Sequence, residues 1–286
     1  MQPAVSFGTE KQTALNRIDI KSVCNGRQKG YDSMRVKVCG MSDIGQCRQL
    51  NEDSFRVCGF EGGVPSGACV LADGMGGHNA GEVASSTAAE LIIKELAETL
   101  DEHDEKQITK NIEGAVDFAN TTVYEMSLDN SAQAGMGTTL VIAYVKDSLV
   151  RFANIGDSRG YAVSSGGIKR ITVDHSVVEE LVQRGTITRE EARNHPDKNI
   201  ITRALGTEGF VDADFYDYTV SEGETIILCS DGLTEMVTED EIKDIINGFD
   251  NIDEAVKALV DEANKNGGVD NITVVALQFE KEESII

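Results

Sequence analysis

Apolar residues recur along the chain with two spacings, one typical of strands and one typical of helices. Alternation or unbroken apolar runs predict strands at residues 34–41, 55–58, 68–71, 139–145, 149–153, 160–163, 168–171, 225–229 and 272–277. Apolar residues at helical spacing predict helices over residues 79–100, 108–126 and 252–263. Capping patterns with a glutamate three residues later predict helix starts at Asn79, Thr188 and Thr238. Long amphipathic helices next to strands predict helical layers packed on β-sheets.

The order of these elements predicts one large domain with an insertion. The runs between residues 139 and 171 are joined by short turns, which predicts an antiparallel meander. Residues 174–208 are polar and carry short helical pieces, so we interpret them as a surface subdomain or flap. No repeat or linker divides residues 34–281, which we take as the domain. Residues 1–33 are interpreted as an N-terminal extension, either an edge strand or a loose segment, and residues 282–286 as a tail.

Three aspartates occupy similar positions at the ends of predicted strands. Asp73 and Asp231 each follow an apolar run and precede a glycine, and Asp270 comes just before the last strand. If these strands are neighbours in antiparallel sheets, the three carboxylates meet at one rim, where they need a cation to remain ionised together. The glycine after Asp73 leaves the backbone unobstructed, so a carbonyl can face the same point. Oxygen ligands without sulfur favour Mg²⁺ or Mn²⁺ over zinc.

Composition narrows the class of protein. The chain has 286 residues, 40% of them hydrophobic, which is enough for a large core. Its net charge of −23 argues against nucleic acid and anionic membranes as partners. It has neither a signal-peptide pattern nor an apolar run of about 18 residues, so we expect a cytoplasmic protein that does not span a membrane. The six cysteines show no Cys-x-x-Cys spacing, which argues against a zinc site or a disulfide framework.

A basic residue ahead of the first aspartate is a candidate to bind a phosphate, although an arginine in isolation is more often simply solvated. Arg48 begins the run Arg48-Gln49-Leu50-Asn51-Glu52-Asp53, and a planar guanidinium can donate two parallel hydrogen bonds to a phosphate. Two divalent ions about 4 Å apart can deprotonate a water between them and hold a phosphoryl group for in-line attack. Phosphate monoesters hydrolyse so slowly unaided that they need such help.

The chain resembles the metal-dependent protein phosphatase family of the type 2C kind, in its bacterial form. The resemblance covers roughly residues 34–280. It rests on six motifs in the family's order: Arg48-x-x-Asn51-Glu52-Asp53, Asp73-Gly74-Met75-Gly76-Gly77-His78, Gly135-Met136-Gly137-Thr138-Thr139, Gly156-Asp157-Ser158-Arg159, Ser230-Asp231-Gly232-Leu233 and Gly268-Val269-Asp270-Asn271-Ile272-Thr273.

The resemblance implies a fold and an activity. The fold would be α+β, a four-layer α-β-β-α sandwich of two antiparallel β-sheets flanked by helices, with residues 174–208 as the flap. The activity would be that of a serine/threonine phosphoprotein phosphatase in signalling. Its partners would be phosphoserine and phosphothreonine proteins, including a serine/threonine protein kinase, and we expect a monomer.

The resemblance also implies roles for the main site residues. Asp73 would bridge two ions of Mn²⁺ or Mg²⁺, and the Gly74 carbonyl would bind one of them. Asp231 and Asp270 would hold the other ion. Arg48 would grip the substrate phosphate while a hydroxide between the ions attacks in line, without a phosphoenzyme.

Further positions in the same motifs have less direct roles. Glu52 and Asp53 would act largely through metal-bound waters. A third ion is left open, because this chain has Glu235 where members of the family often carry an aspartate. Asp129 is the other candidate ligand of that third ion. By the same resemblance, Asp157 looks structural, as does the run Gly137-Thr138-Thr139.

The general acid is left open. Animal members of the family carry a histidine two residues after the bridging aspartate, where this chain has Met75. His78 is close in sequence, but a structural role at the start of a helix explains it at least as well. For His175 and His195, in or beside the flap, a structural or solvent-facing role is favoured. A metal-bound water is the alternative acid.

Two other functions compete with a phosphatase. The run Gly156-Asp157-Ser158-Arg159-Gly160 matches the Gly-x-Ser-x-Gly elbow of serine hydrolases, but a strand is predicted after it where an elbow needs a helix. A metal-binding scaffold without activity would require a lost ligand, and none of the two-metal ligands is missing. The sequence therefore favours the phosphatase.

Overall fold

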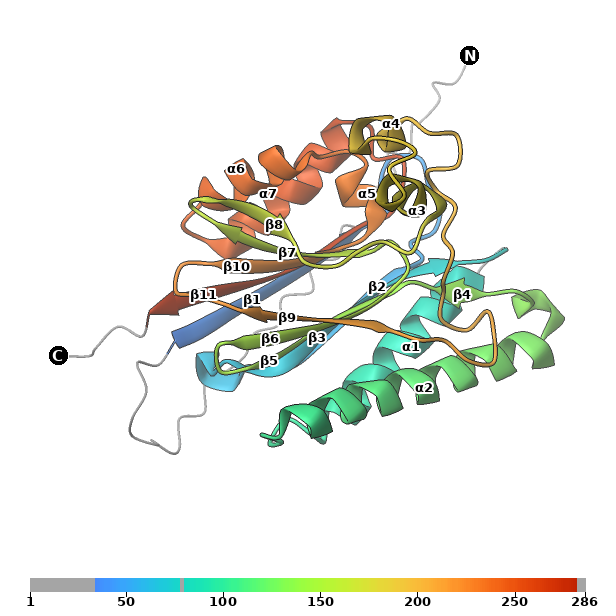
Figure 1. Cartoon of the computed structure of the whole chain (residues 1–286), viewed down its shortest axis with the longest axis horizontal. Coiled ribbons are helices and arrows are strands. Elements are labelled where there is room, and N and C mark those ends of the chain that lie inside the picture. Colours follow the sequence, from blue (N-terminus) through green and yellow to red (C-terminus); the bar gives the residue numbers. More distant parts are fainter. Residues whose placement is uncertain (1–33, 78–79, 282–286) are drawn as a thin grey trace, which may run out of the picture.

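A computed structural model describes residues 34–77 and 80–281, which form two antiparallel β-sheets lying face to face between helices (Figure 1). In the first sheet the strand order is β1 (Met34–Asp43), β11 (Ile272–Lys281), β10 (Thr225–Cys229), β7 (Arg159–Ser164) and β8 (Gly167–Arg170). In the second sheet it is β2 (Asp53–Gly59), β3 (Ser66–Met75), β5 (Leu140–Lys146), β6 (Leu149–Ile155) and β9 (Asp214–Thr219). The short β4 (Gly137–Thr138) pairs with the end of β3.

Helices cover the outer face of each sheet, as Figure 1 shows. Helices α1 (Ala80–Ala97) and α2 (Glu105–Asp129) pack on the second sheet, and α6 (Glu239–Asn247) and α7 (Ile252–Lys265) pack on the first. Shorter helical elements are η1 (Glu61–Gly63), η2 (Ser131–Gln133), α3 (Val177–Gln183), α4 (Arg189–Arg193) and α5 (Asp231–Thr234). The expected α-β-β-α sandwich is confirmed. None of the helices in the described part of the chain is long and apolar enough to cross a membrane.

Apolar side chains fill the three interfaces between the four layers. Between the two sheets, the described residues form one buried cluster that includes Phe55, Leu71, Phe152, Leu228 and Leu277. A second cluster joins α1 and α2 to one sheet, and a third joins α6 and α7 to the other. Strands buried on both faces read as unbroken apolar runs, which is why the sequence pattern identified β5, β10 and β11.

The sequence predicts helix starts where side chains cap the first turn. Thr188 begins α4 and Thr238 begins α6, and each forms the predicted capping box with the glutamate three residues later. The cap predicted at Asn79 lies outside the described residues, as do the extension over 1–33 and the tail over 282–286.

The predicted meander over residues 139–171 is wrong at its centre. Strands β5 and β6 form one hairpin and β7 and β8 form another, but the two hairpins belong to different sheets. The chain crosses between the sheets at 156–158, where Gly156 has a φ of 94°, a conformation that favours glycine. Local patterning cannot distinguish this crossing from an ordinary hairpin turn, because both need a glycine and polar neighbours.

The sequence pattern also missed strand β9. Residues Phe215, Tyr216 and Tyr218 lie among exposed polar residues, and the strand pairs with β6 at the edge of the second sheet. Helices α3 and α4 were predicted within the flap, and a bridge between Ser176 and Ile201 ties the two ends of that segment together.

Candidate active site

The predicted metal ligands lie at one end of the sandwich, where strands of both sheets end. Asp53 and Asp73 face each other across the β2–β3 pair. Asp231 follows β10 as the first residue of α5, and Asp270 lies two residues before β11, which pairs with β10. We had expected the three aspartate strands to be sheet neighbours, but Asp73 belongs to the other sheet, so the site spans the gap between the sheets.

These carboxylates act strongly on one another. We call Glu52, Asp53, Asp73, Asp231 and Asp270 the carboxylate cluster. Burial raises the pKa of Asp73 well above its usual range, and the charges of Asp53 and Asp231 raise it further. Burial also raises the pKa of Asp231, with Asp157 and Asp270 as the next causes, and it raises the pKa of Asp53 to about 6. A cluster of this kind holds its negative charge at neutral pH only when a cation compensates it.

The donor atoms of the cluster fit a hard divalent cation. Glu52 Oε1, Asp53 Oδ1 and Asp231 Oδ1 are buried oxygens without a hydrogen-bond partner among the described residues. Buried acceptors are rarely left unpaired, and a cation satisfies them. As placed, no three acidic, cysteine or histidine side chains in the described ranges converge closely enough to hold a metal ion.

Glycine brings helix α1 directly against the turn that carries Asp73. A Cβ at Gly74 would collide with the carbonyl oxygen of Gly81, and a Cβ at Gly81 would collide with Glu52 Oε1. This close approach explains the glycine after Asp73 better than an ordinary surface turn does. It also brings the backbone of Gly74 beside the cluster.

Arg48 lies at the mouth of the cluster and pairs with one of its members. Its Nη2 donates to Asp270 Oδ2 at 2.7 Å, and its side chain is about half exposed. The hydrogen bond to Asp270 is the largest cause that raises the pKa of Arg48, and Glu52 and Asp73 contribute. The predicted phosphate-binding residue is therefore beside the predicted metal ligands and open to solvent.

Two polar residues that the sequence analysis did not single out hold the cluster in place. Asn271 Oδ1 accepts a hydrogen bond from the backbone N–H of Glu52 at 2.9 Å, and its Nδ2 donates to two loop carbonyls. Ser230 Oγ donates to Asp53 Oδ2 at 2.7 Å. Each lies next to a predicted ligand in sequence, which was the only signal available.

Asp157, which we expected to be structural, lies close enough to act on this site. It occupies the crossing between the sheets, and burial raises its pKa to about 6, with Asp174 as the next cause. Its charge acts in turn on Asp73 and Asp231. It comes two residues after the buried strand β6, so a similar pattern of an apolar run near an acidic residue could have identified it.

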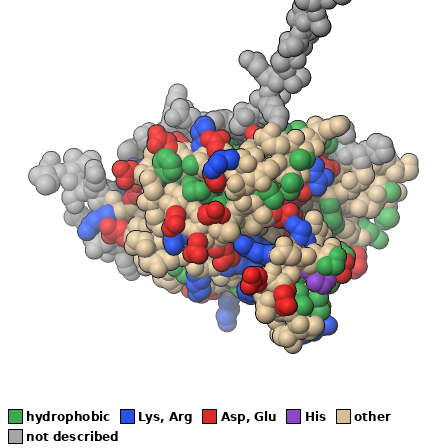
Figure 2. All heavy atoms as spheres, turned by 90° about the horizontal axis from the view of Figure 1, so that it is seen from above, with side chains coloured by type: hydrophobic (Ala, Val, Ile, Leu, Met, Phe, Trp, Pro, Cys, Tyr) green, Lys and Arg blue, Asp and Glu red, His purple; other side chains and the backbone are tan. Residues whose placement is uncertain are grey.

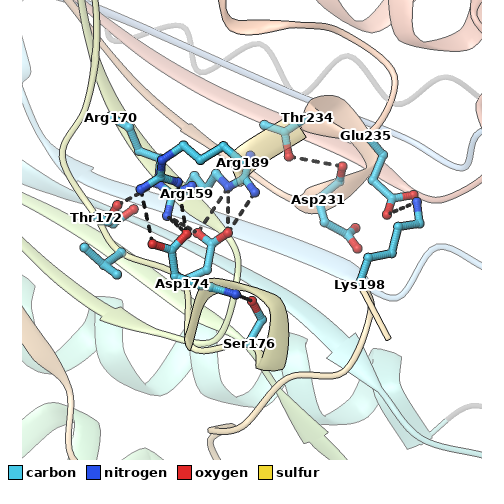
Figure 3. Close-up of polar contacts among 12 residues, drawn as sticks. Arg159, Arg170, Thr172, Asp174, Ser176, Arg189, Lys198, Asp231, Thr234 and Glu235 are labelled. Carbon is cyan, nitrogen blue, oxygen red and sulfur yellow. Dashed lines mark hydrogen bonds and ion pairs between the residues drawn. The ribbon is translucent and has the colours of Figure 1, made fainter. Parts of the chain in front are cut away.

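The two residues proposed for a third ion have different surroundings. Glu235 lies one residue after α5, where its Oε1 accepts a hydrogen bond from Lys198 Nζ at 2.7 Å (Figure 3). Its charge also raises the pKa values of Asp157 and Asp231. Asp129 is the exposed last residue of α2. Neither role is tested, and both stay predictions.

Arginine–carboxylate pairs anchor the flap beside the site. Figure 3 shows Asp174 between the guanidinium groups of Arg159 and Arg170, with N–O distances of 2.7 and 3.4 Å. Glu179 on α3 pairs with Arg170 at 2.9 Å and with Arg189 at 3.1 Å. The flap is thereby held to strands β7 and β8 of the first sheet.

His175 and His195 make local contacts within or beside the flap. His175 Nδ1 accepts a hydrogen bond from the Gly156 N–H at 3.1 Å, and its Nε2 faces Asp214 Oδ2 at 3.1 Å. His195 Nδ1 accepts from the N–H of Asp197. These contacts agree with the structural roles we favoured, whereas His78 lies outside the described residues.

The structure contradicts the serine hydrolase alternative. Ser158 is fully buried, and its Oγ bonds to Thr139 Oγ1 at 2.7 Å. Strand β7 follows it where a nucleophile elbow needs a helix. The partners of His175 are Gly156 and Asp214, so His175 does not activate the Ser158 hydroxyl.

Comparison with known proteins links this site to one family. A family model described as Protein phosphatase 2C matches residues 42–266. The serine/threonine phosphatase stp of Listeria monocytogenes is 40% identical over 237 residues, which cover 83% of this chain and 93% of that relative.

Solved structures give the same result. The serine/threonine phosphatase of S. agalactiae superposes with a TM-score of 0.80 at 34% identity, covering 85% of this chain and 99% of the other. The catalytic domain of the phosphatase PstP, in complex with two manganese ions, gives a TM-score of 0.75 at 32% identity, covering 87% and 100%.

Proposed function

The chain belongs to the protein phosphatase 2C family and is a serine/threonine phosphatase of the bacterial type, and we propose that it hydrolyses phosphoserine and phosphothreonine in proteins with two bound Mn²⁺ or Mg²⁺ ions. The carboxylate cluster carries this proposal. Its buried oxygens without partners require a cation, and the relative PstP contains two manganese ions. An inactive scaffold would lack a ligand, whereas every two-metal ligand that the family resemblance calls for is present here.

The residues divide into ligands and orienting groups. Asp73 would bridge the ions with help from the Gly74 carbonyl, and Asp231 and Asp270 would hold the second ion. Glu52 and Asp53 would bind through waters. Two such ions, when bound, lower the pKa of a water between them and neutralise charge on the phosphoryl oxygens.

The protein's own side chains would position the phosphate and the ligands. Arg48 is charged at all relevant pH values, and its exposed fork can exchange Asp270 for two phosphate oxygens. Ser230 and Asn271 fix Asp53 and the Glu52 backbone, so the cluster keeps its geometry while substrate binds. The buried Ser158 hydroxyl is not available as a nucleophile, which agrees with hydrolysis without a phosphoenzyme.

Hydrolysis of p-nitrophenyl phosphate with Mn²⁺ tests the proposal. We expect Asp231→Asn to lower kcat by more than about 100-fold, because loss of a partner outside the metal sphere alone costs about 10- to 100-fold. The control Asp240→Asn changes an exposed carboxylate on α6 and should keep activity. No turnover by the unaltered protein with any divalent metal would refute the proposal.

We also propose, from the family, that the substrates include a serine/threonine protein kinase and that the protein is a cytoplasmic monomer. Light scattering of the purified protein checks the monomer. Incubation with an autophosphorylated kinase of the same cell checks the substrate, through loss of its phosphothreonine signal.

A further inference from the structure

A cavity of about 370 Å³ opens beside the turn that carries Asp73. It is lined by Met75 and by a segment that leaves the flap: Ile201, Thr202, Arg203, Ala204, Thr207, Glu208, Phe210, Val211 and Asp212. Met75 is two residues beyond Asp73 on the same strand, so one residue lines the cavity while its near neighbour belongs to the carboxylate cluster. The cavity and the cluster are therefore adjacent.

Backbone hydrogen bonds hold the cavity wall in register with the cluster. Gly74 and Met75 pair with β4, and the next pairing joins Thr138 of β4 to Leu205. The two hydrogen bonds between Thr138 and Leu205 measure 3.0 and 2.9 Å. The cavity wall therefore has a fixed position relative to Asp73, unlike a wall formed by an untethered loop.

The lining of the cavity combines apolar side chains with acidic ones. Phe210 is 65% exposed, and Met75 also contributes to the lining. Arg203 donates to Asp214 at 2.8 Å, so its charge is already compensated. Glu208 and Asp212 line the cavity, are exposed and have no ion-pair partner among residues that the structure describes, so their charges are uncompensated.

We propose that this cavity binds an apolar side chain of the phosphoprotein substrate, two or three residues from the phosphorylated serine or threonine, and that Glu208 and Asp212 favour a neighbouring lysine or arginine. From Asp73 to Met75 the chain advances about 7 Å, which an extended substrate spans with two to three residues. This inference rests on the proposed function, because the phosphorylated residue must be at the carboxylate cluster.

Synthetic phosphothreonine peptides test the apolar contact. In each peptide one position, two or three residues before or after the phosphothreonine, carries leucine, alanine or aspartate, and released phosphate gives kcat/KM. We expect kcat/KM with leucine at one of these positions to be about tenfold higher than with alanine, which is the usual discrimination for a few methylenes in an apolar pocket. In the Phe210→Ser variant, the ratio of kcat/KM for leucine to that for alanine should fall to about twofold or less.

The matched control is another exposed phenylalanine far from the cavity. Phe249 lies in the loop between α6 and α7, on the opposite helical layer, and Phe249→Ser should keep the leucine preference. Because p-nitrophenyl phosphate has no flanking residues, its turnover should be the same in the unaltered protein and in both variants.

A charge reversal tests the acidic side chains of the lining. A peptide with lysine beside the leucine should be hydrolysed several-fold faster than a peptide with glutamate at the same position. In the Glu208→Lys variant the glutamate peptide should be the faster of the two. Glu222→Lys, in the exposed turn before β10, makes the same change in net charge elsewhere and should leave the order unchanged.

The outcomes separate the two proposals. Loss of all p-nitrophenyl phosphate turnover in the unaltered protein refutes the phosphatase itself. Normal turnover with equal kcat/KM for all peptides refutes the cavity as a substrate site, as does a leucine preference that survives Phe210→Ser.

Discussion

At the scale of single residues, His175 connects the flap to the crossing between the sheets. Its Nδ1 accepts the Gly156 N–H, so the proton of the neutral ring sits on Nε2, facing Asp214. A proton on Nδ1 would oppose the Gly156 N–H. Burial lowers the pKa of His175, and this effect is larger than the increase caused by the hydrogen bond to Asp214. The nearby charge of Arg203 also lowers this pKa, whereas the charge of Asp174 raises it.

This geometry predicts a pH dependence of stability. Below about pH 6.5, His175 becomes protonated in the unfolded chain but stays neutral in the folded protein. The free energy of unfolding therefore falls as the pH drops through this range. Above pH 6.5 the effect is absent, since both states are neutral. We expect His175→Asn, whose amide oxygen can accept the Gly156 hydrogen bond, to lose less stability than the unaltered protein between pH 7.5 and 5.

Urea unfolding across that pH range measures the difference. Because other groups titrate in both proteins, the quantity to compare is the gap between the two free energies of unfolding. A gap that stays constant from pH 7.5 to 5 would show that His175 does not titrate as inferred.

Most of the predicted metal ligands were identified from acidic residues near the ends of predicted strands. Asp73, Asp231 and Asp270 were identifiable because an apolar run next to an acidic residue is a local pattern. Asp157 has a similar pattern, but its neighbours in space are distant in sequence, and this hid its place beside Asp231. Asn271 acts through a backbone N–H that is 219 positions away, which no local pattern reveals.

At the scale of elements, the flap is attached through α3. Glu179 on this helix is buried and pairs with guanidinium groups from β8 and from the first residue of α4. A buried carboxylate that loses its charge leaves such groups without compensation. The flap should therefore depend on Glu179 more than on any exposed ion pair.

We predict that Glu179→Gln releases the flap without unfolding the sandwich. A hydrogen bond to a charged group contributes about 1.5–3 kcal/mol, so amide exchange over 177–193 should accelerate by about ten- to a hundredfold. Exchange in β10 and β11 should stay unchanged. The matched control is Glu180→Gln, which removes an exposed pair with Arg184 and should change little. Equal effects of the two variants would contradict the anchor.

Elements with local causes were predictable, and elements with distant causes were not. The capping boxes at Thr188 and Thr238 depend on residues three positions apart, and both were predicted. Strand β9 forms by pairing with β6 at the edge of the second sheet. Its alternation of tyrosine and aspartate is too short to predict a strand from the sequence. The crossing at Gly156 depends on which sheet receives β7, a question of tertiary packing.

At the scale of the whole molecule, the fold buries acidic side chains close together, and a bound cation would compensate their charges. An ion that binds only the folded protein stabilises it in proportion to the logarithm of its concentration, by about 2.7 kcal/mol at 100 times its Kd. We predict that Mn²⁺ raises the unfolding temperature and that Asp231→Asn loses most of this increase. Asp240→Asn should retain it.

Thermal unfolding with and without Mn²⁺ measures this effect independently of catalysis. The same increase in both variants would mean that the ion binds somewhere other than at Asp231. The order of the motifs was sufficient to predict the sandwich as a whole, but the division of the strands between two sheets was not visible from spacing.

The pairing of β1 with β11 has a consequence for how the protein is made. Met34 lies opposite Lys281, so the first and last described strands are neighbours, and β10 pairs with the other side of β11. Of the described strands, β11 is the last to leave the ribosome during translation, and such long-range pairing forms slowly. Asp270 lies just before β11, so it joins the other carboxylates only once that strand has docked. We therefore expect a nascent chain to lack phosphatase activity until its synthesis has passed β11.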